Sequence, residues 1–147
     1  AGWQVLHLRG PGQAAAEPPP PGVVHVDYTD RMEWALACAD LVVSRAGAAT
    51  VSELGILGLP AVFVPYHVGN GEQQRNARFA VEAGGAVVVS THDFTIDWVR
   101  DFLVPILSTP DQRAQMAAAM ASTGRRDAAH RIAHWALDAA NTHQGGR

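Results

Sequence analysis

Two short segments of the sequence carry residue types suited to binding an anion or a sugar. The first, Ser44–Glu53 (SRAGAATVSE), joins an apolar run to a helix-like segment. Its small residues would let an anion approach the free N–H groups at a helix start, where the helix dipole favours negative charge. Ala48, Ala49 and Thr50 would supply those N–H groups. Arg45 would add a charge-assisted contact or, alternatively, form a structural salt bridge.

Glu53, about one helical turn further on, has two interpretations. Its carboxylate would accept hydrogen bonds from two neighbouring hydroxyls, such as those of a ribose. Alternatively, Thr50 and Glu53 match the S/T-x-x-E capping box, in which each side chain satisfies a backbone N–H at the helix start. The two interpretations are compatible, so the pattern predicts a helix start that also binds a ligand.

The second segment, residues 65–77 (PYHVGNGEQQRNA), combines a turn with a polar helix start. Asn70-Gly71 is a turn signal, and Glu72 and Gln73 begin the helix. Gln73 and Asn76 are three residues apart and therefore share a helix face, where their amides would both donate to and accept from sugar hydroxyls. The alternative is a polar first turn that faces water.

The elements that position these segments alternate between strands and helices, as in an α/β fold with a doubly wound, Rossmann-like parallel sheet. Strands are predicted at 3–8, 23–26, 41–44, 61–64 and 86–89. Helices are predicted at 31–39, 49–57, 73–83, 96–107, 111–121 and 127–140. Ligands of such sheets collect at the carboxyl ends of the strands, so three loops are expected at one edge: 28–32, 44–53 and 67–76.

Composition excludes several classes of function. A net charge of −3 with scattered basic residues gives no electrostatic case for nucleic-acid binding. The single cysteine, Cys38, excludes a disulfide framework, and the histidines lack metal-ligand spacing; His130 and His134 fit a helix-surface pair. No P-loop, G-x-S-x-G elbow or D-x-D triplet is present, so the sequence predicts no metal site and no cofactor.

The chain length of 147 residues fits one domain, and no apolar run is long enough to span a membrane. Residues 10–22 (GPGQAAAEPPPPG) form the one low-complexity stretch. Four consecutive prolines favour an extended surface loop, with a peptide for a proline-binding domain as the alternative. The sequence starts almost directly with a strand pattern and without Met, which suggests part of a longer chain.

The two segments together resemble the C-terminal half of the MurG family of N-acetylglucosaminyltransferases, and the GNGEQ form resembles its actinobacterial branch. The quoted motifs are SRAGAATVSELGILGLPAVFVPY, GNGEQQRNA and the AGGAVVV strand, in the family's order. The resemblance implies the C-terminal, UDP-GlcNAc-binding domain of a GT-B glycosyltransferase, spanning residues 1–147. The domain's own first strand and Gly-rich loop, which the family places earlier, are expected to be missing.

The resemblance also implies roles for single residues. Glu53 would hold the uridine ribose, and the helix start at 48–50 would contact the diphosphate. Gln73, with Glu72 or Asn76, would read the GlcNAc hydroxyls. The uracil would lie between Tyr28 and Thr29, with Met32 beside them. No catalytic residue is expected in this chain, because the family's acceptor site and candidate base lie in the N-terminal domain.

The implied reaction is an inverting transfer of GlcNAc to lipid I, giving lipid II for the cell wall, at the cytoplasmic face of the plasma membrane. Lipid I and the membrane would be bound through the N-terminal domain. Two alternatives remain open at this point: a non-catalytic donor-binding subunit that needs a partner chain, and a UDP-GlcNAc epimerase. An epimerase would need carboxylates and a histidine at the sugar, and Glu72 is the one obvious candidate.

Overall fold

The computed structural model describes residues 2–13, 18–66 and 70–144 and divides the chain into two compact units, Ala1–Ala39 and Asp40–Arg147. Part of the predicted Pro-rich loop (14–17) and part of the second predicted loop (67–69) lie outside the described residues. Each unit has its own parallel sheet, which confirms the predicted α/β class.

The N-terminal unit contains two parallel strands and a short helix. Strand β1 (Val5–Leu8) pairs with β2 (Val23–Val26), and α1 (Met32–Ala37) follows. The register places His7 opposite His25, with ring centroids 5.2 Å apart. Both predicted strands and the predicted helix are thereby confirmed; β2 has the predicted bounds, and β1 and α1 are slightly shorter than predicted.

The C-terminal unit contains a three-stranded parallel sheet in the order β3 (Val42–Ser44), β4 (Ala61–Phe63), β5 (Ala86–Val88). Val43 pairs with Val62, which in turn pairs with Val87. The three strands therefore end level with one another. Because they run parallel, the loops that follow them leave from the same edge of the sheet. This agrees with the prediction for the segments 44–53 and 67–76, whereas 28–32 belongs to the N-terminal unit and its part in the site stays a prediction.

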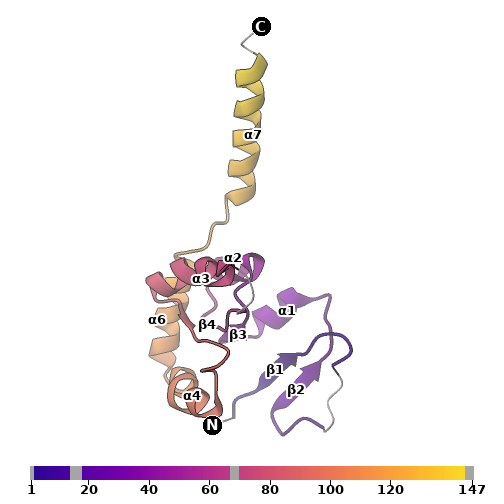
Figure 1. Ribbon diagram of the computed structural model, residues 1–147, viewed down its shortest axis with the longest axis vertical. Coiled ribbons are helices and arrows are strands. Elements are labelled where there is room, and N and C mark those ends of the chain that lie inside the picture. Colours follow the sequence, from indigo (N-terminus) through magenta and orange to yellow (C-terminus); the bar gives the residue numbers. More distant parts are fainter. Residues whose placement is uncertain (1, 14–17, 67–69, 145–147) are drawn as a thin grey trace. The chain divides into compact units, whose positions relative to one another are not determined.

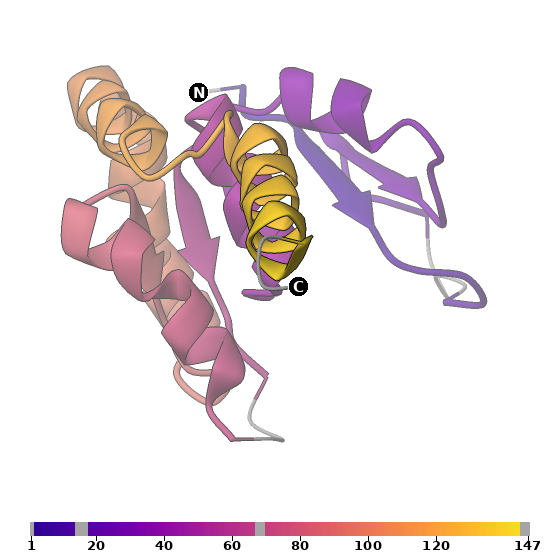
Figure 2. The same cartoon turned by 90° about the horizontal axis from the view of Figure 1, so that it is seen from above.

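Helices surround the central strand of this sheet. Every residue of β4 is fully buried, as expected for a parallel strand covered on both faces. The helices α2 (Ala48–Leu57), α3 (Glu72–Ala83) and α6 (Pro110–Ala121) pack against one another beside the strands (Figure 1; Figure 2). A further apolar cluster is built on Val62, Val64, Val89 and Leu103, and partly buried hydrophobic residues that include Phe94 and Trp98 pack against it.

The predicted helix at 96–107 is interrupted. It consists of α4 (Ile96–Trp98), a π-helical segment η1 (Val99–Leu103) and α5 (Val104–Ser108). Pro105 lacks the N–H that would bond to the Asp101 carbonyl in a continuous α-helix, and the π-helical segment ends two residues before this proline. The predicted helix at 111–121 is confirmed as α6, which begins one residue earlier at Pro110, and the preceding Thr109 makes no side-chain cap. The connection that contains Gly124 separates α6 from α7 (Ala128–Gln144).

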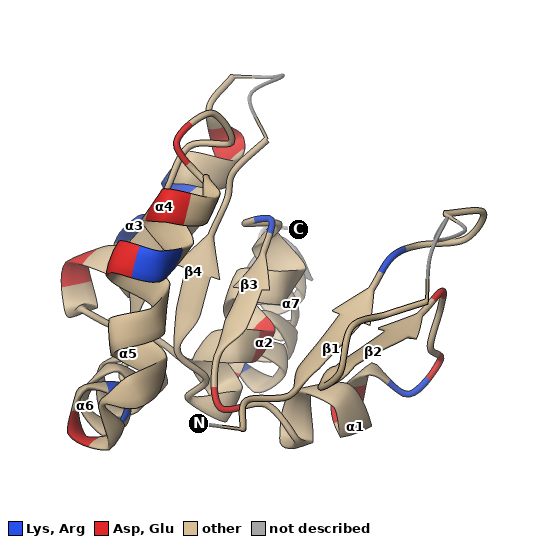
Figure 3. Ribbon diagram, turned by 90° about the horizontal axis from the view of Figure 1, so that it is seen from below, with Lys and Arg blue, Asp and Glu red and all other residues tan. Residues whose placement is uncertain are grey.

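Charge is distributed unevenly over the C-terminal unit. Strands β3 and β4 carry no charged residue, whereas α3 displays both acidic and basic ones and α4 carries the acidic Asp97 (Figure 3). Within the described residues, no helix is long and apolar enough to cross a membrane. The same part of the chain holds no cluster of His, Cys, Asp and Glu that could bind a metal ion.

Candidate functional site

The start of α2 leaves its backbone N–H groups open. Gly47 precedes the helix in an extended conformation and provides no side-chain cap, and the first helical hydrogen bond runs from the Val51 N–H to the Gly47 carbonyl at 2.9 Å. The N–H groups of residues 48–50 precede that bond and have no partner within the helix. Ala48 and Ala49 are exposed, and no acidic residue lies in the first turn. The positive end of the helix dipole is thus uncompensated and accessible.

The predicted capping box is wrong. Thr50 is the third residue of α2 and not its N-cap, because the helix begins three residues earlier than the box requires. Alanine has the strongest helix propensity, and Gly47 is itself a tolerated N-cap, so the chain enters the helix at Ala48. Glu53 is exposed, and among the described residues its carboxylate has no hydrogen-bond or ion-pair partner. Its acceptor oxygens are therefore available to a ligand.

Arg45 binds to neighbouring loops of the same unit. Its Nη1 donates to the Val64 carbonyl at 2.9 Å and to the Thr91 hydroxyl at 3.0 Å. A longer contact of 3.4 Å reaches the Pro65 carbonyl, and the guanidinium lies 5.1 Å from the centre of the Tyr66 ring. The alternative of a structural salt bridge is wrong, because the acceptors are two carbonyls and a hydroxyl.

Gln73 and Asn76 both project from α3 toward the loops that follow the strands. The Tyr66 N–H donates to Gln73 Oε1 at 2.9 Å, and Asn76 Nδ2 donates to the Ala46 carbonyl at 3.1 Å. The purely water-facing alternative is therefore wrong. Each amide still has one polar atom without a protein partner in the described residues: Nε2 of Gln73 is a donor and Oδ1 of Asn76 is an acceptor.

Glu72 occupies the first turn of α3, after Gly71 in the left-handed conformation (φ 70°). Its side chain is exposed, and its negative charge complements the helix dipole. The start of α3 thus supplies its own anion, whereas the start of α2 does not. Between these two helix starts, α2 is the one suited to an anionic ligand.

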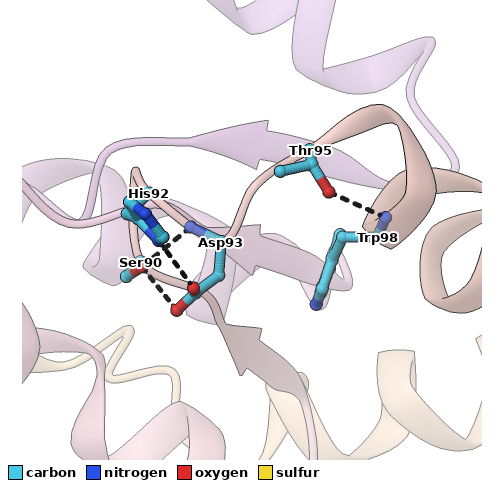
Figure 4. Close-up of polar contacts among 5 residues, drawn as sticks. All are labelled: Ser90, His92, Asp93, Thr95 and Trp98. Atoms are coloured by element: carbon cyan, nitrogen blue, oxygen red, sulfur yellow. Dashed lines mark hydrogen bonds and ion pairs between the residues drawn. The ribbon is translucent and has the colours of Figure 1, made fainter.

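A turn after β5 contains a serine, a histidine and an aspartate in hydrogen-bonding contact (Figure 4). Ser90 Oγ donates to Asp93 Oδ2 at 2.7 Å, and His92 Nδ1 lies 3.0 Å from Asp93 Oδ1. Asp93 sits between the other two residues, whereas a nucleophilic triad needs the histidine between serine and carboxylate. These contacts therefore shape the turn and do not activate Ser90. Thr95 then caps α4 by accepting from the Trp98 N–H at 3.2 Å.

Sequence reasoning missed Tyr66 and Thr91 as neighbours of the site. Both follow strands of the sheet, and the rule that ligands collect at the carboxyl ends of strands would have pointed to the turn after β5 as well. The strand at 86–89 was predicted, so the signal for Thr91 was present in the sequence.

The remaining predicted site residues belong to the N-terminal unit. Tyr28 is 73% exposed and Met32 is 42% exposed. The Thr29 hydroxyl accepts from the Arg31 N–H at 3.0 Å, a local turn contact. Their exposure leaves them accessible to a ligand, and their part in uracil binding stays a prediction.

Comparison with known proteins identifies the family. Residues 2–132 match the family model described as the glycosyltransferase family 28 C-terminal domain. Over 138 residues, covering 94% of this chain and 38% of the relative, the chain is 53% identical to a protein of Clavibacter sepedonicus. That protein is named UDP-N-acetylglucosamine-N-acetylmuramyl-(pentapeptide) pyrophosphoryl-undecaprenol N-acetylglucosamine transferase. A protein of the same name from Mycobacterium sp. (strain KMS) is 46% identical, over 100% of this chain and 40% of the relative.

Solved structures agree with this assignment. The crystal structure of Acinetobacter baumannii MurG aligns with a TM-score of 0.78 at 26% identity, covering 88% of this chain and 39% of that one. The glycotransferase of kitacinnamycin aligns with a TM-score of 0.67 at 25% identity, over 90% of this chain and 35% of that one. The chain spans about two fifths of the length of the named relatives. It belongs to glycosyltransferase family 28, as a C-terminal domain of that family.

Proposed function

We propose that this chain is the UDP-GlcNAc-binding domain of a transferase that moves GlcNAc onto lipid I in peptidoglycan synthesis. Support comes from the Clavibacter and Mycobacterium relatives, whose names state an N-acetylglucosamine transferase acting on a pyrophosphoryl-undecaprenol. In this proposal the acceptor, the catalytic base and any membrane contact belong to the part of the relatives that this chain does not cover. The enzyme would work as a peripheral protein at the cytoplasmic face of the plasma membrane.

The open start of α2 is the observation that carries the proposal. A nucleotide diphosphate would lie against the N–H groups of residues 48–50, where the helix dipole favours its charge. Glu53, exposed one turn further along the same helix, would accept from the two ribose hydroxyls. Tyr28, Thr29 and Met32 are proposed to contact the uracil.

The sugar is proposed to bind at the start of α3. Gln73 Nε2 would donate to one GlcNAc hydroxyl, and Asn76 Oδ1 would accept from another. Each amide is already fixed by its second polar atom, on Tyr66 and Ala46 respectively. Because both side chains are already held in place, little conformational entropy is lost when they bind the sugar hydroxyls. Glu72 would lie nearby, as the resemblance suggests.

The chemistry that follows is a displacement at the anomeric carbon. The acceptor hydroxyl oxygen forms a bond to that carbon and its proton passes to the catalytic base of the uncovered part, while the bond to the UDP oxygen breaks and UDP leaves with the electron pair. Negative charge thus develops on the diphosphate. N–H groups and the dipole of α2 would stabilise this charge as it forms, which lowers the barrier because they are oriented before the reaction.

Titration of the chain with UDP-GlcNAc, UDP-glucose and UDP tests the proposal directly. UDP-GlcNAc is expected to bind most tightly. In the Gln73→Glu variant an oxygen still accepts from the Tyr66 N–H, but the donor to the sugar is lost. Its affinity for UDP-GlcNAc should fall by about 1 kcal/mol, while its affinity for UDP stays unchanged. Equal binding of all three ligands by the unmodified chain would contradict a sugar-reading role.

A domain exchange tests the transferase activity. The matching 138 residues of the Clavibacter relative are replaced by those of this chain, and transfer of GlcNAc to lipid I is measured. Activity in the exchanged protein supports the proposal. Release of a C2-epimerised sugar, without transfer, would support the epimerase alternative. Donor binding that occurs only after a separate partner protein is added would support the subunit alternative.

A further inference from the structure

Arg45 connects the ends of all three strands of the C-terminal sheet. It follows β3 directly, and its Nη1 reaches the carbonyl of Val64 after β4 and the hydroxyl of Thr91 after β5, at 2.9 and 3.0 Å. Backbone pairing between β3 and β4 ends with the Val64 N–H donating to the Ser44 carbonyl at 2.8 Å. Beyond this last backbone hydrogen bond, the side chain of Arg45 links the loops that follow the two strands.

The loop held by Arg45 is also the loop that fixes the start of α3. Val64 and Pro65 are buried, and the next residue, Tyr66, donates its N–H to Gln73. From α3, Asn76 donates back to the carbonyl of Ala46, the residue after Arg45. The contacts therefore form a closed circuit through the loop after β3, the loop after β4 and the first turns of α3.

Arg45 makes these contacts through the shape of its guanidinium group and not through its charge alone. The guanidinium donates through its Nη1 to acceptors on two loops, while its central carbon lies over the Tyr66 ring, 5.1 Å from the ring centre. A lysine ammonium carries the same charge but lacks the planar group that lies over the ring. Both carbonyl acceptors are uncharged, so the contacts rely on geometry more than on charge.

We propose that Arg45 is a positioning residue, which sets the sugar-reading amides of Gln73 and Asn76 through the loop after β4, and is not a ligand of the diphosphate. The proposal rests on the UDP-GlcNAc site proposed above. It differs from a direct diphosphate contact in a measurable way. A positioning residue affects recognition of the sugar, whereas a diphosphate ligand affects UDP and UDP-GlcNAc equally.

The Arg45→Lys variant separates these two roles because it keeps the positive charge. We expect its affinity for UDP-GlcNAc to fall about tenfold or more, the change that follows loss of a hydrogen bond to a charged group. Its affinity for UDP should change less than about twofold, as for a surface substitution. Amide hydrogen exchange, measured without ligand, should show faster exchange at the Tyr66 N–H, since the loop after β4 is no longer held.

Two further variants complete the experiment. Thr91→Val removes one acceptor of Arg45 from an exposed position and should show the same selective loss in weaker form. Arg78→Lys, at an exposed arginine of α3 that pairs with Glu82, is the matched control and should change neither affinity. Equal loss of UDP and UDP-GlcNAc binding in Arg45→Lys, or unchanged exchange at Tyr66, would overturn the proposal. Absence of UDP binding by the unmodified chain would instead contradict the proposed function, and the exchange measurement would still decide whether Arg45 holds the loop.

Discussion

The two ends of α2 are built in opposite ways. At its N-terminal end the helix begins with two exposed alanines after an extended glycine, without a side-chain cap and without an acidic residue. At its C-terminal end, Leu54 and Gly55 are buried, and Gly58 ends the helix in the left-handed conformation at φ 69°. One end is closely packed, and the other has its backbone exposed.

Close backbone contact accounts for the packing of the C-terminal end. A Cβ built on Gly124, after α6, would lie 2.5 Å from the Gly55 carbonyl oxygen and 2.8 Å from the Ile56 nitrogen. Arg126 then donates to the Ile56 carbonyl at 3.2 Å. These contacts fix the helix by the end distant from the proposed ligand, so the exposed N-terminal N–H groups need no side chain of their own to hold them in place.

Gly124→Ala is expected to have the largest effect of the substitutions considered, and it acts on the packed end. The added methyl group meets backbone atoms that cannot rotate away, so the free energy of unfolding should fall by about 3 kcal/mol, at the upper end of overpacking costs. Urea denaturation measures the change. Gly2→Ala is the control, because a Cβ at Gly2 would meet nothing within 4 Å. If the two variants were equally stable, the C-terminal end of α2 would not require so close an approach of the Gly124 and Gly55 backbones.

Ala49→Glu tests the open end. A carboxylate beside the proposed diphosphate should weaken UDP binding by about 3 kcal/mol, the order of a repulsion between nearby charges at a protein surface. The same carboxylate complements the helix dipole, so the free energy of unfolding should stay level or rise by about 0.3–1 kcal/mol.

Ala128→Glu is the matched control for Ala49→Glu. It adds the same charge to the first turn of α7, which also lacks an acidic residue. Its UDP affinity should equal that of the unmodified chain. Unchanged UDP binding in Ala49→Glu itself would show that the start of α2 is not the diphosphate site.

Much of this arrangement could be predicted from the sequence. Each of the five strands is a short apolar run bounded by turn or polar residues, and each was placed within two residues of its observed bounds. The helix start at residues 48–50 was also predicted from the local sequence, because small residues follow a strand there. These features depend on local composition, which a single sequence displays.

The features that could not be predicted depend on contacts between distant segments. Arg45 binds the carbonyl of Val64 because the register of β3 and β4 brings their ends together, and no local pattern encodes that register. The capping-box prediction failed for a local reason. Thr50 and Glu53 have the spacing of a capping box, but this spacing does not determine where the helix begins. The alanines before Thr50 let the helix begin earlier.

Glu53→Gln is expected to have a smaller effect than Ala49→Glu. It replaces a charged acceptor of the ribose hydroxyls by a neutral one, so UDP affinity should fall by roughly 1–3 kcal/mol. Stability should hardly change, because Glu53 has no partner among the described residues. Calorimetric titration and thermal unfolding measure the two quantities. Glu82→Gln, at another exposed glutamate, is the control and should leave UDP binding unaltered. If stability fell and UDP affinity did not, Glu53 would be a structural residue and not a ligand of the ribose.

Thr50→Val is expected to have the smallest effect, and it tests whether the open end of α2 acts through its backbone alone. An N-cap threonine contributes about 1 kcal/mol to stability, but Thr50 lies inside the helix, so the free energy of unfolding should change by less than about 0.5 kcal/mol. The valine keeps the backbone N–H and the branched shape while it removes the hydroxyl. UDP affinity should therefore stay within about twofold of the original if the N–H groups bind the diphosphate. A loss of about 1 kcal/mol in affinity with stability unchanged would mean that the Thr50 hydroxyl itself contacts the ligand. An equal loss in stability would restore its role as a cap.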